Sequence, residues 1–134
     1  MKYGHISMKS EEIGKKGEDV ACQYLVGKGH TIADRNFKVK SGEIDVVSEK
    51  NGTLFFIEVK TTVQNVARPD EFRQRPEENV TSSKMSKLSR AIRIYLEKKY
   101  KNRDVSWEFW VVAITLDLDT RKAFVNVIPE VLVG

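Results

Sequence analysis

The feature that most constrains the fold of this chain is a pair of strand-like segments, 42–47 and 53–61, joined across Asn51-Gly52. Asn-Gly between alternating segments is a strong signal for a tight hairpin turn. Because strand side chains alternate between two faces, each segment should present two different faces. The first strand should place Glu43, Asp45 and Val47 on one face and Ile44 and Val46 on the other; the second should place Leu54, Phe56, Glu58 and Lys60 opposite Phe55, Ile57 and Val59.

Charged side chains gather at one end of this predicted hairpin. Pairing in the register set by the turn brings Asp45 beside Glu58 and Lys60. Magnesium is a hard cation that binds through one or two carboxylates and keeps several waters, and manganese accepts the same oxygen ligands. The pattern therefore predicts metal-assisted phosphodiester hydrolysis, with Asp45 and Glu58 as ligands and Lys60 stabilising developing negative charge or orienting the water. The carbonyl of Val59 offers a further oxygen ligand, and Glu43 or Glu18 is expected to bind a second ion or a coordinated water.

The acid-x-Lys triplet alone is a weak signal. It recurs at Glu97-Lys98-Lys99, in a predicted helix where residues two apart do not face each other. Glu58-Val59-Lys60 is a stronger signal than Glu97-Lys98-Lys99 only because it lies in a predicted strand, belongs to a hairpin and follows the Gly-Glu-Ile-Asp run at 42–45. An exposed cross-strand ion pair on a solvated face is the structural alternative for the same side chains.

The motif residues also resemble a known family. The pattern resembles the YraN family of small bacterial proteins, which is similar to archaeal Holliday-junction resolvases and to PD-(D/E)xK nucleases of restriction-endonuclease-like fold. The resemblance covers roughly residues 11–114 and implies Asp45 and Glu58 as metal ligands, Lys60 as the catalytic lysine and Glu18 as an accessory acid. It also implies a possible homodimer, since two symmetric cuts need two sites. The residues that carry it are Gly17-Glu18, Ala21, Tyr24-Leu25, Gly29, Asn36, Gly42-Glu43-Ile44-Asp45, Glu58-Val59-Lys60-Thr61, Lys84, Ala91 and Tyr95-Leu96.

Two positions depart from the family pattern. Thr62 stands where the family usually has arginine, and Trp110 stands where it usually has an aspartate in a late strand. Neither position is one of the predicted ligands.

Length and composition fit one globular domain. The chain has 134 residues, which is long enough to bury a core without disulfides. Its composition, 40% hydrophobic and 31% charged, is ordinary for a globular protein. Its single cysteine, Cys22, is expected to be a small apolar helix residue rather than a nucleophile. The start of the sequence lacks a signal-peptide core and no apolar run reaches membrane length, so we expect a cytoplasmic protein without a membrane role.

A first helix is expected from Ser10 to Lys28. Its apolar positions recur at helical spacing, and Gly27 and Gly29 suit its C-terminal stop. Glu18 borders this apolar face, so it can point inward toward the strand acids. A solvated helix glutamate is the commoner alternative.

A second helix is expected from Ser82 or Ser83 to about Lys101, with an apolar stripe of Met85, Leu88, Ile92, Tyr95 and Leu96. Its other face is strongly cationic, and the net charge of +4 also favours a polyanionic partner. We expect this face to contact the phosphate backbone of DNA without reading sequence, although a solvated surface helix is the alternative. The nucleic-acid-binding residues predicted here are Lys84, Lys87, Arg90 and Arg93.

The remaining segments complete an α/β fold. Strands are expected at 31–39, 105–115 and 123–128, the middle one buried on both faces with its tryptophans in the core. Residues 1–9 are expected to be a loose tail and 62–81 a flexible loop, either a flap beside the site or a loop without a role. The order helix, three strands, helix, two strands predicts a restriction-endonuclease-like mixed sheet flanked by helices.

Three functions fit these patterns. The first is a Mg²⁺- or Mn²⁺-dependent endonuclease acting on structured or branched DNA. The second is a non-catalytic nucleic-acid binder that kept the nuclease fold, and the third is a protein-interaction domain. Loss of DNA binding with rising salt separates the first two from the third.

Overall fold

The computed structural model describes residues 10–64, 82–101 and 103–129. The predicted order of elements is confirmed, and the ends of several elements shift by one to three residues. The chain forms helix α1 (Ser10–Gly27), strands β1 (Thr31–Val39), β2 (Gly42–Lys50) and β3 (Thr53–Gln64), helix α2 (Ser82–Tyr100), and strands β4 (Ser106–Asp117) and β5 (Ala123–Ile128).

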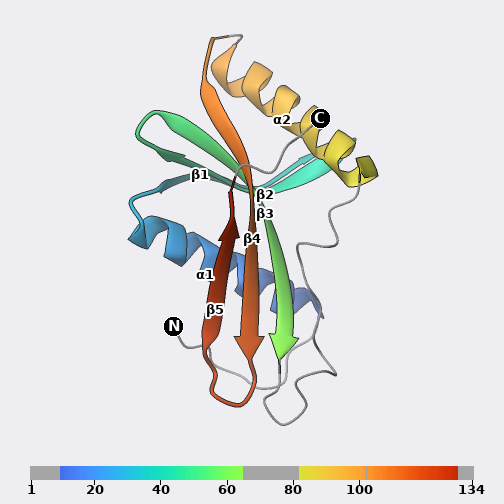
Figure 1. Ribbon diagram of the computed structural model, residues 1–134. Helices are drawn as coiled ribbons and strands as arrows, with labels where there is room; N and C mark the ends of the chain where they lie inside the picture. The colour runs from blue at the N-terminus through green and yellow to red at the C-terminus, as the bar shows by residue number, and fades with distance from the viewer. Residues whose placement is uncertain (1–9, 65–81, 102, 130–134) are drawn as a thin grey trace.

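The five strands form one mixed sheet in the order β1-β2-β3-β4-β5. Neighbouring strands are antiparallel except β3 and β4, which are parallel from Thr53↔Ser106 to Gln64↔Asp117. A parallel pair needs a long crossover, and the segment containing α2 provides it. β4 lies between β3 and β5, so the prediction of a buried central strand is confirmed (Figure 1).

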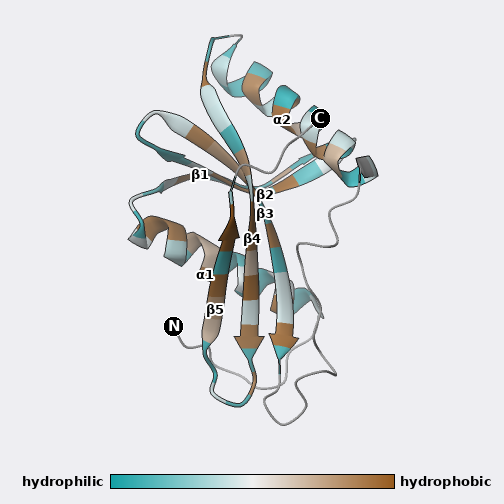
Figure 2. Ribbon diagram, in the orientation of Figure 1, coloured by the Kyte–Doolittle hydropathy of each residue, from teal (hydrophilic) through white to brown (hydrophobic). Residues whose placement is uncertain are grey.

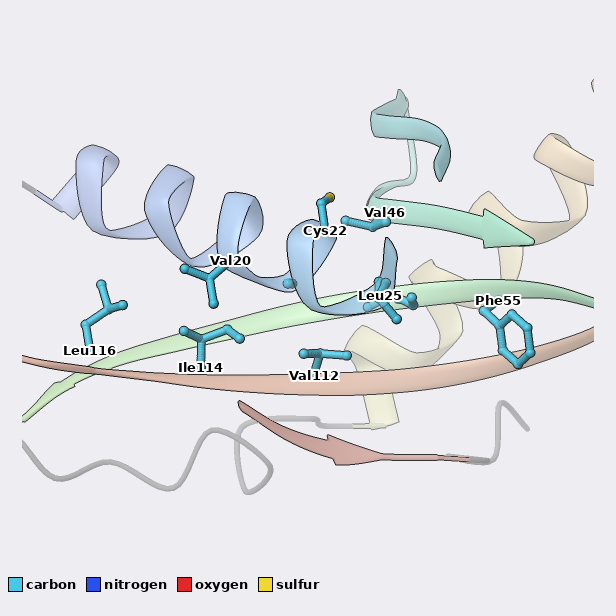
Figure 3. Close-up of a cluster of buried hydrophobic side chains, with 10 residues drawn as sticks. Val20, Cys22, Leu25, Val46, Phe55, Val112, Ile114 and Leu116 are labelled. Atoms are coloured by element: carbon cyan, nitrogen blue, oxygen red, sulfur yellow. The ribbon is translucent and has the colours of Figure 1, made fainter. Parts of the chain in front are cut away.

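Helix α1 covers one face of the sheet. Its apolar side chains pack on the inward residues of β2, β3 and β4, and Figure 3 shows this cluster. The predicted second face of β3 is confirmed, since Phe55 and Ile57 are buried here and Val59 packs against them. The buried members are Val20, Ala21, Cys22, Leu25, Val46, Phe55, Ile57, Val112, Ile114 and Leu116.

Helix α2 covers the opposite face, over β1 and β2 (Figure 1). Its apolar stripe is confirmed, and Figure 2 shows brown and teal residues alternating along the helix as expected for an amphipathic element. The buried members of this second cluster are Ile44, Val47, Leu54, Phe56, Leu88, Ala91, Ile92, Tyr95, Phe109 and Val111.

Two expectations about this part of the chain need correction. Thr62 to Gln64 belong to β3 instead of a loop, because β3 continues its parallel pairing with β4 to Asp117. Trp107 is 38% exposed, although its ring contacts Phe56, so it is not a core residue. The predicted tail 1–9 and the rest of the predicted loop, 65–81, lie outside the described residues.

Candidate active site

The site forms where β2 and β3 separate. Their backbone pairing runs from Lys50↔Thr53 to Val46↔Ile57 and goes no further toward the start of β2. Beyond that point the Asp45 carboxylate takes the place of a strand partner, and its Oδ2 accepts the backbone N–H of Val59 at 2.8 Å. Asp45 and Glu58 therefore lie close together, as predicted. At this point, however, the two strands are joined by the Asp45 side chain and not by backbone hydrogen bonds.

A local irregularity turns β2 at this point. Ile44 and Val46 were expected on one face, but Ile44 packs under α2 and Val46 packs under α1. The register with β1 places Asn36 opposite Asp45, and Asn36 has a φ of 54°. Left-handed backbone is uncommon outside glycine but tolerated by asparagine, and such strand irregularities redirect side chains. The prediction failed because strict alternation was assumed through this kink.

Glu58 is held by lysines from two elements. Its side chain is only 9% exposed, and its Oε1 contacts Lys60 Nζ at 3.2 Å and Lys84 Nζ at 2.6 Å. Lys60 is the expected neighbour two residues along β3. Lys84 comes from the first turns of α2, so this contact joins the helix to the sheet at the site.

Asn36 links the accessory acids. With its amide oriented so that nitrogen is the donor, Nδ2 lies 3.2 Å from Glu18 Oε1 and 3.1 Å from Glu43 Oε1. Glu18 also faces Arg35 at 3.8 Å, while Arg35 makes its closer pair with Asp19 at 2.8 Å. Glu18 and Glu43 thus lie near Asp45, and the side-chain amide of Asn36 donates a hydrogen bond to each of them.

Close packing of α1 fixes the position of Glu18. A Cβ built on Gly17 would overlap the Thr61 hydroxyl and come within 2.8 Å of Thr61 Cβ and Cγ2. Glycine therefore lets the helix lie directly on β3 one residue before Glu18.

Two cavities flank the carboxylates, and Asp45 and Glu58 line both. The first, of about 490 Å³, lies under the start of α2 and is also lined by Gly42, Glu43, Ser83, Lys84, Lys87 and Leu88. The second, of about 460 Å³, lies beside α1 and is also lined by Ser10, Ile13, Gly14, Glu18, Val59, Thr61, Thr62 and Val63. The two carboxylates are therefore shared by both cavities.

Burial perturbs the titratable groups of the site. It raises the pKa of Asp45 from 3.8 to about 7; the Val59 N–H opposes this rise, and Glu58, Glu18 and Glu43 add to it. Burial also raises the pKa of Glu18, despite the opposing contacts of Asn36 and Arg35. Strongly perturbed carboxyls in a cleft are typical of functional sites.

The two lysines shift in opposite directions. Burial, together with the neighbouring Lys84, lowers the pKa of Lys60. Burial is the largest single effect on Lys84 and acts to lower its pKa, but the contacts with Glu58, Lys60 and Asp45 together outweigh burial, so the pKa is raised. Both ammonium groups contact the Glu58 carboxylate, and that of Lys84 is the nearer.

The donor set fits a hard divalent cation held by few protein ligands. Among the described residues Asp45 Oδ1 accepts no hydrogen bond, and the lysine contacts of Glu58 both use Oε1. The N–H of Val59 points toward β2, and in a strand the carbonyl of the same residue points the same way. Within the described ranges no three His, Cys, Asp or Glu side chains form a metal-binding group, so Glu43 and Glu18 do not complete such a group. Two carboxylates, a carbonyl and waters match the way proteins bind Mg²⁺.

The four nucleic-acid-binding residues predicted on α2 lie in two different places. Lys84 and Lys87 line the first cavity, and Lys84 contacts Glu58 directly. Arg90 and Arg93 are exposed further along α2 and line neither cavity. Any role of theirs is on the outer surface, beyond the site.

Sequence reasoning missed the part played by Asn36 and the contact between Lys84 and Glu58. The available signal for Asn36 was the polar run Asp34-Arg35-Asn36, which interrupts an otherwise apolar strand. Trp110, the departure from the family pattern, packs against His30 and Phe55 and lines neither cavity.

Fold and site together define a class: a mixed α/β protein whose acidic and lysine side chains meet where a sheet divides. The model of the family described as "Uncharacterised protein family UPF0102" matches residues 17–114. The chain therefore belongs to the UPF0102 (YraN) family, as its motifs predicted. All the predicted site residues, from Glu18 to Arg93, fall within the matched region.

Relatives match over most of their length. A UPF0102 protein from Syntrophomonas wolfei is 42% identical over 88 residues, covering 66% of this chain and 71% of its own. One from Clostridium perfringens is 31% identical over 122 residues, covering 90% and 93%. One from Clostridium novyi is 35% identical over 123 residues, covering 90% and 95%. As for the membrane, no helix within the described ranges has the length and apolarity to cross one.

Proposed function

We propose that this protein is a Mg²⁺- or Mn²⁺-dependent endonuclease of the PD-(D/E)xK class, with a restriction-endonuclease-like fold, that hydrolyses phosphodiester bonds in structured or branched DNA. The observation that carries the proposal is that Asp45 and Glu58 together line two cavities, with Lys60 Nζ 3.2 Å from Glu58 Oε1. The resolvase-like resemblance of the motifs supports a branched substrate, cut by a homodimer.

When bound, a divalent ion would act as a Lewis acid on the phosphate and would lower the pKa of a water molecule that it binds. Asp45 and Glu58 would hold it, with the Val59 carbonyl as a further ligand. The Val59 N–H fixes the Asp45 carboxylate, so that little reorganisation is needed on binding. Lys60 lies beside Glu58, where it can stabilise negative charge that develops on the phosphate.

The surface around the first cavity suits a polyanion. Lys84 and Lys87 line it, and both lie in the first turns of α2, where the helix dipole also favours negative charge. Contacts of this kind hold a phosphate backbone without reading bases, in keeping with recognition of DNA shape.

A non-catalytic DNA binder is the second proposal, and one observation favours it. Glu58 is paired with two ammonium groups, as in a structural ion-pair cluster. Such a protein would bind DNA in a salt-sensitive way and cut nothing.

Cleavage of labelled single-stranded, duplex and four-way-junction DNA tests both proposals. The natural protein is compared with Asp45→Asn and Lys60→Ala in Mg²⁺ or Mn²⁺. A nuclease cuts at least one substrate, and both variants lose cutting while retaining DNA binding. Salt-sensitive binding without cutting, unchanged in the variants, establishes the non-catalytic binder instead.

A further inference from the structure

Lys84 occupies an unusual position for a residue of a DNA-binding helix. Its Nζ lies 2.6 Å from Glu58 Oε1, closer than the Nζ of Lys60 at 3.2 Å, although Lys60 is only two residues from Glu58 in the same strand. The ammonium therefore points into the site, toward the carboxylate that the proposed metal needs.

Two cations cannot share this carboxylate with a divalent ion at no cost. Oxygen ligands lie about 2 Å from Mg²⁺, so an ion bound to Glu58 would lie within a few ångströms of both ammonium groups. The like-charge repulsion is strong at that range in a half-buried cavity. Both lysines have the same flexible stem, but Lys84 starts on α2 and borders the first cavity, whereas Lys60 starts on β3 beside Glu58 and does not line that cavity. Lys84 is therefore the group that can leave.

We infer that Lys84 is a place-holding cation: it neutralises Glu58 in the metal-free protein, competes with the divalent ion for that carboxylate, and moves to a phosphate oxygen of the DNA when metal and substrate bind. The movement of Lys84 to a DNA phosphate rests on the proposed function. No bond is made or broken in the exchange, since one cation replaces another at the carboxylate.

The cavity allows this movement. Lys84 lines the first cavity together with Asp45 and Glu58, and its side chain is 33% exposed, so it borders the space that a phosphate would enter. Lys87 lies one turn further along α2 and lines the same cavity, but it is exposed and forms no ion pair with Glu58. It therefore provides a matched control with the same charge and the same helix.

The test is Mn²⁺ binding without DNA, measured by calorimetry for the natural protein, Lys84→Gln and Lys87→Gln at one pH and ionic strength. We expect Lys84→Gln to bind Mn²⁺ about tenfold more tightly, because a cation leaves the ligand carboxylate. Lys87→Gln should change the affinity less than about twofold, because Lys87 forms no ion pair with Glu58 and its exposed charge is screened by solvent and salt. Unchanged or weaker binding in Lys84→Gln overturns the inference.

A charge-retaining variant gives a second test if Lys84→Gln does not fold. Lys84→Arg keeps the cation and can hold the carboxylate through two N–H groups, so it should bind Mn²⁺ more weakly than the natural protein. Tighter or equal binding in this variant contradicts competition.

The outcomes separate this inference from the proposed function. If the natural protein binds Mn²⁺ and cuts DNA but Lys84→Gln leaves the metal affinity unchanged, only the inference fails. If Lys84→Gln binds Mn²⁺ and the natural protein does not, Lys84 blocks the site, and the inference holds while the nuclease activity fails. If neither binds Mn²⁺, both are wrong.

Discussion

Replacing Asp45 by asparagine should stabilise this protein at alkaline pH, the opposite of the usual effect of changing a buried residue. The cause is the burial of the carboxyl group among Glu58, Glu18 and Glu43, which raises its pKa from 3.8 to about 7. Folding therefore makes the charged form of Asp45 costly. An asparagine carries no charge, and its side-chain oxygen can still accept the Val59 N–H.

The magnitude follows from linkage. A pKa that rises from 3.8 to about 7 corresponds to about 4 kcal/mol in favour of the protonated carboxyl. Between these two pH values the folded protein binds a proton that the unfolded chain has lost, so Asp45 lowers the free energy of unfolding as pH rises. Asp45→Asn should be as stable as the natural protein near pH 4 and about 2–4 kcal/mol more stable at pH 8.

Denaturant unfolding at a series of pH values measures this difference. The control is Asp104→Asn, an equal change of charge at an exposed position, which should alter stability by less than about 0.5 kcal/mol. Saturating Mg²⁺ should stabilise the natural protein at pH 8, because only the folded state holds the site, and it should not stabilise Asp45→Asn. Two results would refute a destabilising charge on Asp45: a lower free energy of unfolding for Asp45→Asn than for the natural protein at pH 8, or a difference between the two that does not change with pH.

Four further changes test the packing and the surface. Gly17→Ala should lower stability by about 1–3 kcal/mol in thermal unfolding, because the added methyl group overlaps β3. Gly14→Ala, where nothing lies within 4 Å, should raise it by up to about 1 kcal/mol; equal effects of the two would disprove the close contact. Tyr95→Phe removes the 2.6 Å hydrogen bond to Asp34 and should cost about 1–2 kcal/mol in denaturant unfolding, and no loss would mean that water replaces the hydroxyl. Arg90→Gln should reduce the slope of log affinity for DNA against log salt by about 1, and an unchanged slope would remove this residue from the DNA-binding face.

Local pattern was enough to predict most of the fold. Alternation in β3 predicted which of its residues share a face of the sheet, and the apolar stripe of α2 predicted the buried face of that helix. These signals are reliable here because the apolar positions of each element recur with a fixed period over several turns or residues. The apolar run of β4 was likewise enough to predict a central strand.

The details of the site depend on contacts between distant residues, which no local pattern encodes. The kink at Asp45 needs Asn36 in left-handed backbone on the neighbouring strand, and a single-strand pattern cannot show this. Lys84 was expected on the outer, phosphate-binding face of a helix, but the placement of α2 against the sheet brings it to Glu58. The extra residues of β3, up to Gln64, are ordered by pairing with β4, against their polar character.

The central claim is that Asp45 and Glu58 form a site for a divalent cation, and the most direct measurement is a Mn²⁺ titration of the natural protein and Asp45→Asn at pH 8. The pH is chosen so that the Asp45 carboxyl, with its pKa raised to about 7, is charged. The account predicts saturable Mn²⁺ binding to the natural protein and a loss of at least about tenfold in affinity in Asp45→Asn. Absence of binding to the natural protein, or equal affinity in the variant, would contradict it.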